Sequence, residues 1–137
     1  MNRKEFIQTT YSLCGLGILS ALAAACRKTD KTPQGPTVNF TLDLNAVSNS
    51  ALSSVGGFVY SNGVIVACTA PNTYAAIAQT CTHESCTITY SSSTGNFPCP
   101  CHGGVFNSKG EVLSGPPQIA VKNYAVTKNG NSLTVAG

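Results

Sequence analysis

Short runs of alternating apolar and polar residues dominate the chain after residue 36, a pattern typical of strands with one buried face. The first such run covers residues 38–44, where every second residue is apolar. Residues 74–80 form another apolar run of strand length. No segment after residue 36 shows sustained helical periodicity. The pattern therefore predicts strands and turns.

Two further pairs of apolar runs indicate hairpins. The stronger signal is Asn62-Gly63, because both residue types tolerate positive φ and a tight turn needs it. The second turn is expected at residues 128–131. The flanking runs are residues 57–60 and 64–69 for the first hairpin, and residues 124–127 and 133–135 for the second. We predict an all-β fold over residues 37–137, a small antiparallel sandwich or barrel whose modest core a cross-link or a metal would help to stabilise.

Residues 1–26 have a different composition. They begin with basic residues and continue with an apolar run, residues 13–25, that is shorter than the roughly 20 residues of a transmembrane helix. This order is typical of a secretory signal peptide. The end of the segment resembles a bacterial lipobox, in which Cys26 would be lipidated and become the N-terminus. The alternative is an uncleaved helix that anchors the chain to a membrane.

Residues 27–36 separate this segment from the predicted domain. They are polar, contain two Pro and one Gly, and predict a linker. The formal net charge is +3, but five of the eight Lys and Arg residues lie before residue 32. From Thr37 onward three cations balance three anions. A neutral domain argues against a nucleic-acid partner.

Candidate chemistry is concentrated in two short boxes, residues 81–86 (CTHESC) and 99–104 (CPCHGG). They contain both histidines of the chain and four of the five cysteines after the linker. Their spacing is C-x-H, fifteen residues, then C-x-x-H. Two thiolates and two imidazoles can hold one metal centre, either zinc or iron–sulfur. Cys68 lies outside the boxes in an apolar run and is expected to be a small buried side chain.

The two boxes resemble those of Rieske iron–sulfur proteins. In that family each box gives one Cys and one His to a [2Fe–2S] cluster, with both Cys on one iron and both His on the other. The resemblance therefore implies that Cys81 and Cys99 bind one iron and that His83 and His102 bind the other. It also implies a β domain with a cluster-binding subdomain made of two loops.

Two more features follow from the resemblance. Cys86 and Cys101 stand where Rieske subunits of respiratory and photosynthetic complexes have a disulfide between the two loops, and such a bond suits an oxidising compartment. The alternative is a pair of free thiols. The segment Gly115-Pro116-Pro117 looks like the proline-rich loop that covers the cluster in this family. Its alternative is an ordinary surface turn.

The chain departs from the family pattern at three positions. Gly104 and Phe106 stand where high-potential members have Ser and Tyr, whose hydroxyls donate hydrogen bonds to sulfur. Glu84 stands where the electron-transport type usually has Leu. Because missing donors and an added anion both disfavour the reduced cluster, a lower reduction potential is expected.

The sequence thus predicts a one-electron carrier and no enzyme in its own right. No third histidine remains for a separate two-His-one-carboxylate iron site, which excludes an oxygenase catalytic subunit. We expect an exported, lipid-anchored protein on the periplasmic side of a bacterial cell envelope, attached to the membrane through its N-terminus. Its partner would be a redox protein or a quinol-oxidising complex. The alternatives are a subunit of a larger oxidoreductase, such as a quinol–cytochrome or arsenite-oxidase-like enzyme, and a zinc-stabilised β binding module.

Overall fold

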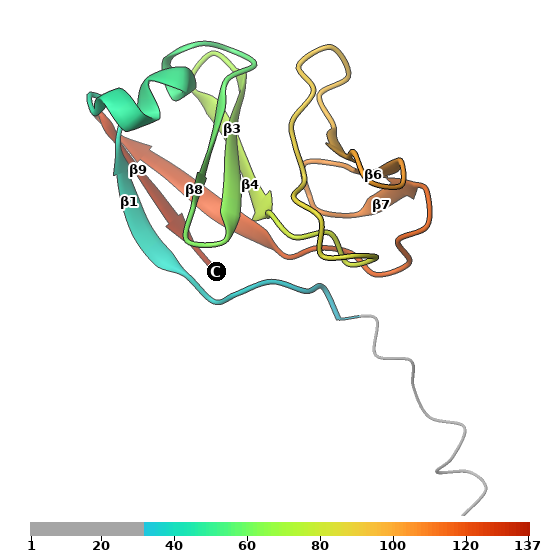
Figure 1. Ribbon diagram of the computed structural model, residues 1–137. Helices are drawn as coiled ribbons and strands as arrows, with labels where there is room; N and C mark the ends of the chain where they lie inside the picture. The colour runs from blue at the N-terminus through green and yellow to red at the C-terminus, as the bar shows by residue number, and fades with distance from the viewer. Residues whose placement is uncertain (1–31) are drawn as a thin grey trace, which may run out of the picture. The chain divides into compact units, whose positions relative to one another are not determined.

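The computed structural model describes residues 32–137, which form two antiparallel sheets (Figure 1). The larger sheet has the strand order β1-β9-β8-β4-β3-β2 and the smaller one the order β5-β6-β7. The strands of the larger sheet are β1 (Asn39–Asp43), β2 (Phe58–Ser61), β3 (Val64–Ala70), β4 (Thr73–Ala78), β8 (Asn123–Asn129) and β9 (Ser132–Ala136). Those of the smaller sheet are β5 (Phe97–Cys99), β6 (Gly104–Phe106) and β7 (Val112–Ser114). The predicted all-β class is confirmed.

The core of the larger sheet is centred on β3. Five consecutive residues of this strand, 64–68, are buried, so both of its faces are covered and its sequence is a continuous apolar run. The outer strand β9 instead alternates and buries only Leu133 and Val135. In the smaller sheet, Phe97 and Phe106 are opposite each other on β5 and β6 and are both fully buried. The smaller sheet therefore has an aromatic core on the two strands that flank the second box.

Both predicted hairpins are present. Asn62 and Gly63 join β2 to β3 with φ values of 52° and 80°, so both residues adopt the left-handed conformation that the dipeptide was expected to favour. The β8–β9 turn is tighter than predicted, because Lys128 and Asn129 still belong to β8. Gly130, with φ of 60°, makes the reversal.

Two parts of the fold were not predicted. A 3₁₀ helix, η1 (Val47–Ser53), follows β1 and buries only Leu52, so its sequence carries no apolar stripe for a pattern to reveal. The strands β5, β6 and β7 have three residues each and are too short to show an alternation.

The last residues of the predicted linker are attached to the domain. The Gln34 N–H donates to the Ala120 carbonyl at 3.0 Å, and the Lys122 N–H donates to the Gln34 carbonyl at 2.8 Å. The Tyr124 hydroxyl donates to the Pro36 carbonyl at 2.7 Å. These bonds hold the entering chain beside the segment that leads into β8.

The predicted signal segment and the predicted lipidation site, Cys26, lie outside the described residues. Within residues 32–137 no helix is long and apolar enough to cross a membrane. The boundary predicted at residue 37 stays a prediction.

Candidate metal centre

The two boxes lie on two loops that a disulfide joins. The first box follows β4, and the second spans the end of β5 and the start of β6. The structure contains a disulfide between Cys86 and Cys101, which confirms the predicted pairing and excludes free thiols at these positions. Each loop is also closed by its own backbone, because the Cys81 N–H donates to the Cys86 carbonyl at 2.8 Å and the Gly103 N–H donates to the Cys99 carbonyl at 3.2 Å.

The two remaining thiols of the boxes are buried side by side. Cys81 is 4% exposed and Cys99 is 3% exposed, and neither takes part in a disulfide. Burial is the main cause that raises the pKa of the Cys99 thiol, and the Cys81 thiol adds to it. The backbone of Cys101 and His102 acts in the opposite direction and lowers the pKa of Cys99.

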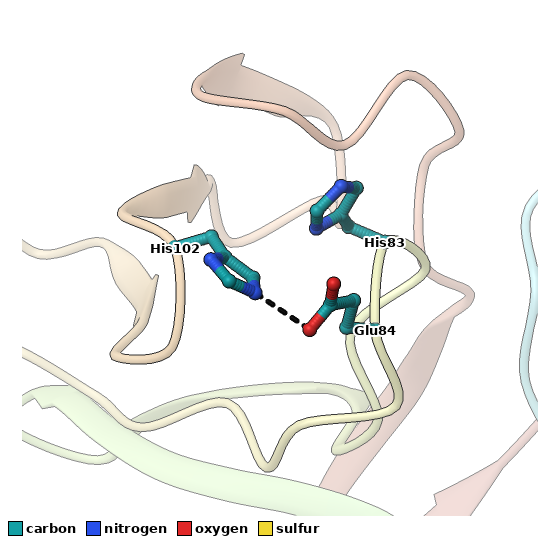
Figure 2. Close-up of side chains that lie close together, drawn as sticks. All are labelled: His83, Glu84 and His102. Carbon is teal, nitrogen blue, oxygen red and sulfur yellow. Dashed lines mark hydrogen bonds and ion pairs between the residues drawn. The ribbon is translucent and has the colours of Figure 1, made fainter.

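The two histidines lie on the outer side of the same loops. His83 and His102 are both exposed, and their rings pack edge to face with centroids 5.1 Å apart and planes at 90° (Figure 2). One imidazole comes from each loop, so the pair exists only while the loops are held together. The four candidate ligands thus separate into two buried sulfurs and two exposed imidazoles.

Glu84 points at the imidazole pair from the first loop (Figure 2). Its carboxylate oxygen Oε2 lies 2.6 Å from Nε2 of His102, and both side chains are about half exposed. The hydrogen bond from His102 is the main cause that lowers the pKa of Glu84. Ligand atoms of His83, Glu84 and His102 all lie within 4.8 Å of one another. This group uses the same two imidazoles as the boxes, so it adds no separate histidine site.

The proline segment packs against the second box. Pro117 is buried, and a Cβ placed on Gly104 would lie 2.8 Å from Pro117 Cγ. Gly115 has φ of 92°, and a Cβ there would lie 2.6 Å from the Gly104 Cα. Glycine is thus required at both positions for this close approach. The segment thus packs against the second box, and its role as a loop that covers the cluster stays a prediction.

Thr82 is a residue of the centre that the sequence analysis missed. Its hydroxyl donates to the Ile119 carbonyl at 2.6 Å and so ties the first box to the chain just after the proline segment. Its place between two candidate ligands is a weak signal, but its partner is 37 residues away and no local pattern indicates it. Cys68 lies on β3, buried and outside the centre, as predicted.

The family model for the Rieske [2Fe-2S] domain matches residues 44–125, well over half of the chain. The chain belongs to the Rieske family. Its domain therefore carries a [2Fe–2S] cluster, and its chemistry is one-electron transfer. This match decides between iron–sulfur and zinc, the two alternatives that the ligand types left open.

Several relatives are iron-sulfur subunits of cytochrome b6-f complexes. The cytochrome b6-f complex iron-sulfur subunit of Chlorobaculum thiosulfatiphilum is 31% identical over 61 residues, 44% of this chain and 34% of that protein. The carotenoid phi-ring synthase of Chlorobaculum tepidum is 39% identical over 62 residues, 45% of this chain and 10% of the enzyme. The chain thus spans about a third or less of the curated relatives it matches.

Solved structures extend the likeness to most of the domain. The cyanobacterial plasma membrane Rieske protein of Synechocystis PCC 6803 is 30% identical with a TM-score of 0.55, and the match covers 74% of this chain and 100% of that one. The ferredoxin of carbazole 1,9a-dioxygenase from Nocardioides aromaticivorans IC177 is 23% identical with a TM-score of 0.53, covering 75% of this chain and 98% of that one. The second likeness shows the fold alone.

The donors of the Rieske domain fit its cluster. Two sulfurs are buried together and two imidazoles are exposed together, which matches a centre in which one iron takes only sulfur ligands from the protein and the other takes only nitrogen ligands. The disulfide joins the two loops, so that the thiol pair and the imidazole pair, each with one member from either loop, stay together.

Proposed function

We propose that Cys81 and Cys99 bind one iron of the cluster and that His83 and His102 bind the other. The separation of donors supports this assignment most directly, because each pair lies together and the pairs differ in burial. Thiolates in the interior are shielded from water, which protects the cluster sulfur. Imidazoles at the surface shorten the path of an electron from the cluster to a docked partner.

When bound, the cluster supplies an acceptor that takes up and releases one electron. The chain contributes the environment of that step. The Cys86–Cys101 disulfide keeps the loops together, and the proline segment packs over the start of β6. A rigid centre that changes little between oxidation states is suited to a carrier.

We further propose that the domain, residues 37–137, is exported and held at the periplasmic side of a bacterial membrane by a lipid on Cys26, with residues 27–36 as the tether. The lipobox-like end of residues 1–26 and the disulfide, which persists in oxidising compartments, support this placement. The likeness to a plasma membrane Rieske protein supports it independently.

The ligand assignment is tested on the purified full chain. Two irons and two acid-labile sulfides per chain are expected, together with the electron paramagnetic resonance spectrum of a reduced cluster with two nitrogen ligands. Replacement of either His83 or His102 by Ala should abolish that spectrum. Stoichiometric zinc without iron, after expression with iron–sulfur assembly intact, would contradict the proposal.

A second candidate is that the chain is a subunit of a quinol-oxidising complex. The relatives that are cytochrome b6-f iron-sulfur subunits favour it. Glu84 argues against a direct contact with quinol. It lies at the tip of the centre, the exposed surface that His83 and His102 form, and a carboxylate there suits an apolar quinol pocket poorly. Purification from solubilised native membranes separates the two cases, since a subunit elutes with larger redox proteins and a free carrier elutes alone.

A further inference from the structure

The contact between Glu84 and His102 joins a carboxylate to the outer nitrogen of a proposed iron ligand. Oε2 of Glu84 lies 2.6 Å from Nε2 of His102, a short distance typical of a charge-assisted hydrogen bond. An ionised carboxylate only accepts hydrogen bonds, so Nε2 carries the proton and donates. A neutral imidazole has one proton, and its lone pair therefore lies on Nδ1.

We infer that Glu84 is a positioning residue for the cluster: it fixes the Nε2–H form and the ring orientation of His102, leaves Nδ1 for iron, and lowers the reduction potential. This inference rests on the proposed ligand role of His102. A carboxylate that accepts a hydrogen bond from a metal-bound imidazole makes the ring a stronger electron donor. A stronger donor and a nearby negative charge both disfavour an added electron.

The two imidazoles differ in this respect. Among residues 32–137, His83 takes part in none of the side-chain hydrogen bonds, whereas His102 is bonded to Glu84. The tip is therefore asymmetric, with one outer nitrogen engaged by the chain itself and one open. A docking partner that forms a hydrogen bond with one of the two imidazoles would therefore use His83, because His102 is already bonded to Glu84.

The contact is specific to the folded loops. Glu84 and His102 are 18 residues apart and belong to different boxes, so the bond forms only when the disulfide and the backbone bonds have brought the loops together. Glu84 is the only acidic residue of either box. Its carboxylate is more than half exposed, so solvent screens its charge and the effect on the potential is moderate.

Two substitutions separate charge from hydrogen bonding. Glu84→Gln keeps an acceptor oxygen of the same reach and removes the charge. Glu84→Leu removes both the charge and the acceptor oxygen and puts an apolar side chain in their place. The matched control is Glu111→Gln, which removes one exposed carboxylate that is also hydrogen-bonded, to Asn107, on the turn before β7 and outside both boxes.

The measurement is the midpoint potential of the purified full chain with its cluster, at neutral pH and one ionic strength. Both Glu84 variants should favour the reduced form relative to the wild type by several-fold, up to about tenfold or about 59 mV for one electron. The control should leave the potential unchanged. Pulsed electron paramagnetic resonance of the reduced cluster should show one of the two histidine nitrogen couplings altered in Glu84→Leu and the other retained.

Iron and sulfide content separates this inference from the proposed function. An intact cluster in all variants, with potentials equal to that of the control, overturns the role of Glu84 and leaves the ligand assignment standing. The absence of a cluster from the wild type overturns the ligand assignment itself. An altered potential with both nitrogen couplings unchanged in Glu84→Leu overturns the positioning of His102.

Discussion

Gly104 is the position at which a single added methyl group tests the packing of the centre. A Cβ there would lie 2.8 Å from Pro117 Cγ and 3.0 Å from Pro117 Cδ, closer than carbon atoms pack. The backbone of Gly104 is not in the left-handed region, so the added methyl group causes crowding but no backbone strain. Overpacking of this kind costs about 1–3 kcal/mol.

Gly104→Ala should therefore lower the free energy of unfolding by about that amount. In a domain of this size each kcal/mol lowers the melting temperature by about 4–8 °C, which thermal unfolding followed by circular dichroism resolves. Replacing Pro117 by Ala in the same chain should relieve the crowding, so the double variant should lose less stability than the two single losses added together. Additive losses, or a Gly104→Ala variant as stable as the wild type, would refute the packing argument.

The same position tests the redox tuning when Ser is compared with Ala. The Cβ at Gly104 would lie 3.6 Å from Cys99 Cβ, so a Ser hydroxyl there is placed to reach the Cys99 sulfur. Both variants share the crowding against Pro117, and their difference isolates the hydroxyl. A hydrogen bond worth about 0.5–1.5 kcal/mol in the reduced state raises a one-electron potential by about 20–60 mV. Equal potentials in voltammetry would show that a donor here does not act on the cluster.

Further substitutions test other parts of the centre. Phe106→Tyr should raise the potential if its hydroxyl reaches sulfur, whereas a fall in melting temperature at constant potential would show a buried hydroxyl without a partner. Cys86→Ala opens a loop of 15 residues and should cost about 3 kcal/mol, seen as faster loss of the visible spectrum on heating; an unchanged cluster lifetime would contradict the role of the bond to Cys101. Thr82→Val removes the hydroxyl donor to residue 119 and should lower stability by about 1 kcal/mol in urea unfolding, an effect that Thr82→Ser should largely reverse. Cys26→Ser should release the protein from membranes into the soluble fraction; a wild-type product that retains residues 1–25 in its mass spectrum would favour the uncleaved anchor.

The features predicted correctly from the sequence are those that local chemistry determines. Asn62-Gly63 demands a tight turn wherever it occurs between strands, and the structure has it. The boxes carry Cys and His at a fixed spacing, so the Rieske family, its [2Fe–2S] cluster and the Cys86–Cys101 pairing followed from residues 81–104 and the family they resemble.

The missed features depend on residues far apart in the chain. The bond between Thr82 and Ile119 and the contact of Gly104 with Pro117 exist only because the chain returns over the boxes after β7. The sequence indicates Glu84 as an added anion near the cluster, but its bond to His102 joins two loops, and no local pattern predicts it. The strands β5, β6 and β7 were missed for a different reason, because three residues are too few to show an alternation of apolar and polar positions.

The bonds from Gln34 to the backbone of residues 120 and 122 make this part of the predicted linker a fixed part of the domain. On the proposed lipid anchor at Cys26, seven residues, 27–33, lie between the lipidated residue and Gln34, the first of the described residues with a backbone bond to the domain. A fully extended chain spans at most about 3.3–3.6 Å per residue, or roughly 25 Å for this length. A tether of this length is shorter than the diameter of a small domain, about 30 Å. The domain would meet its redox partners within a thin layer at the membrane surface, and a distant acceptor would have to come to it.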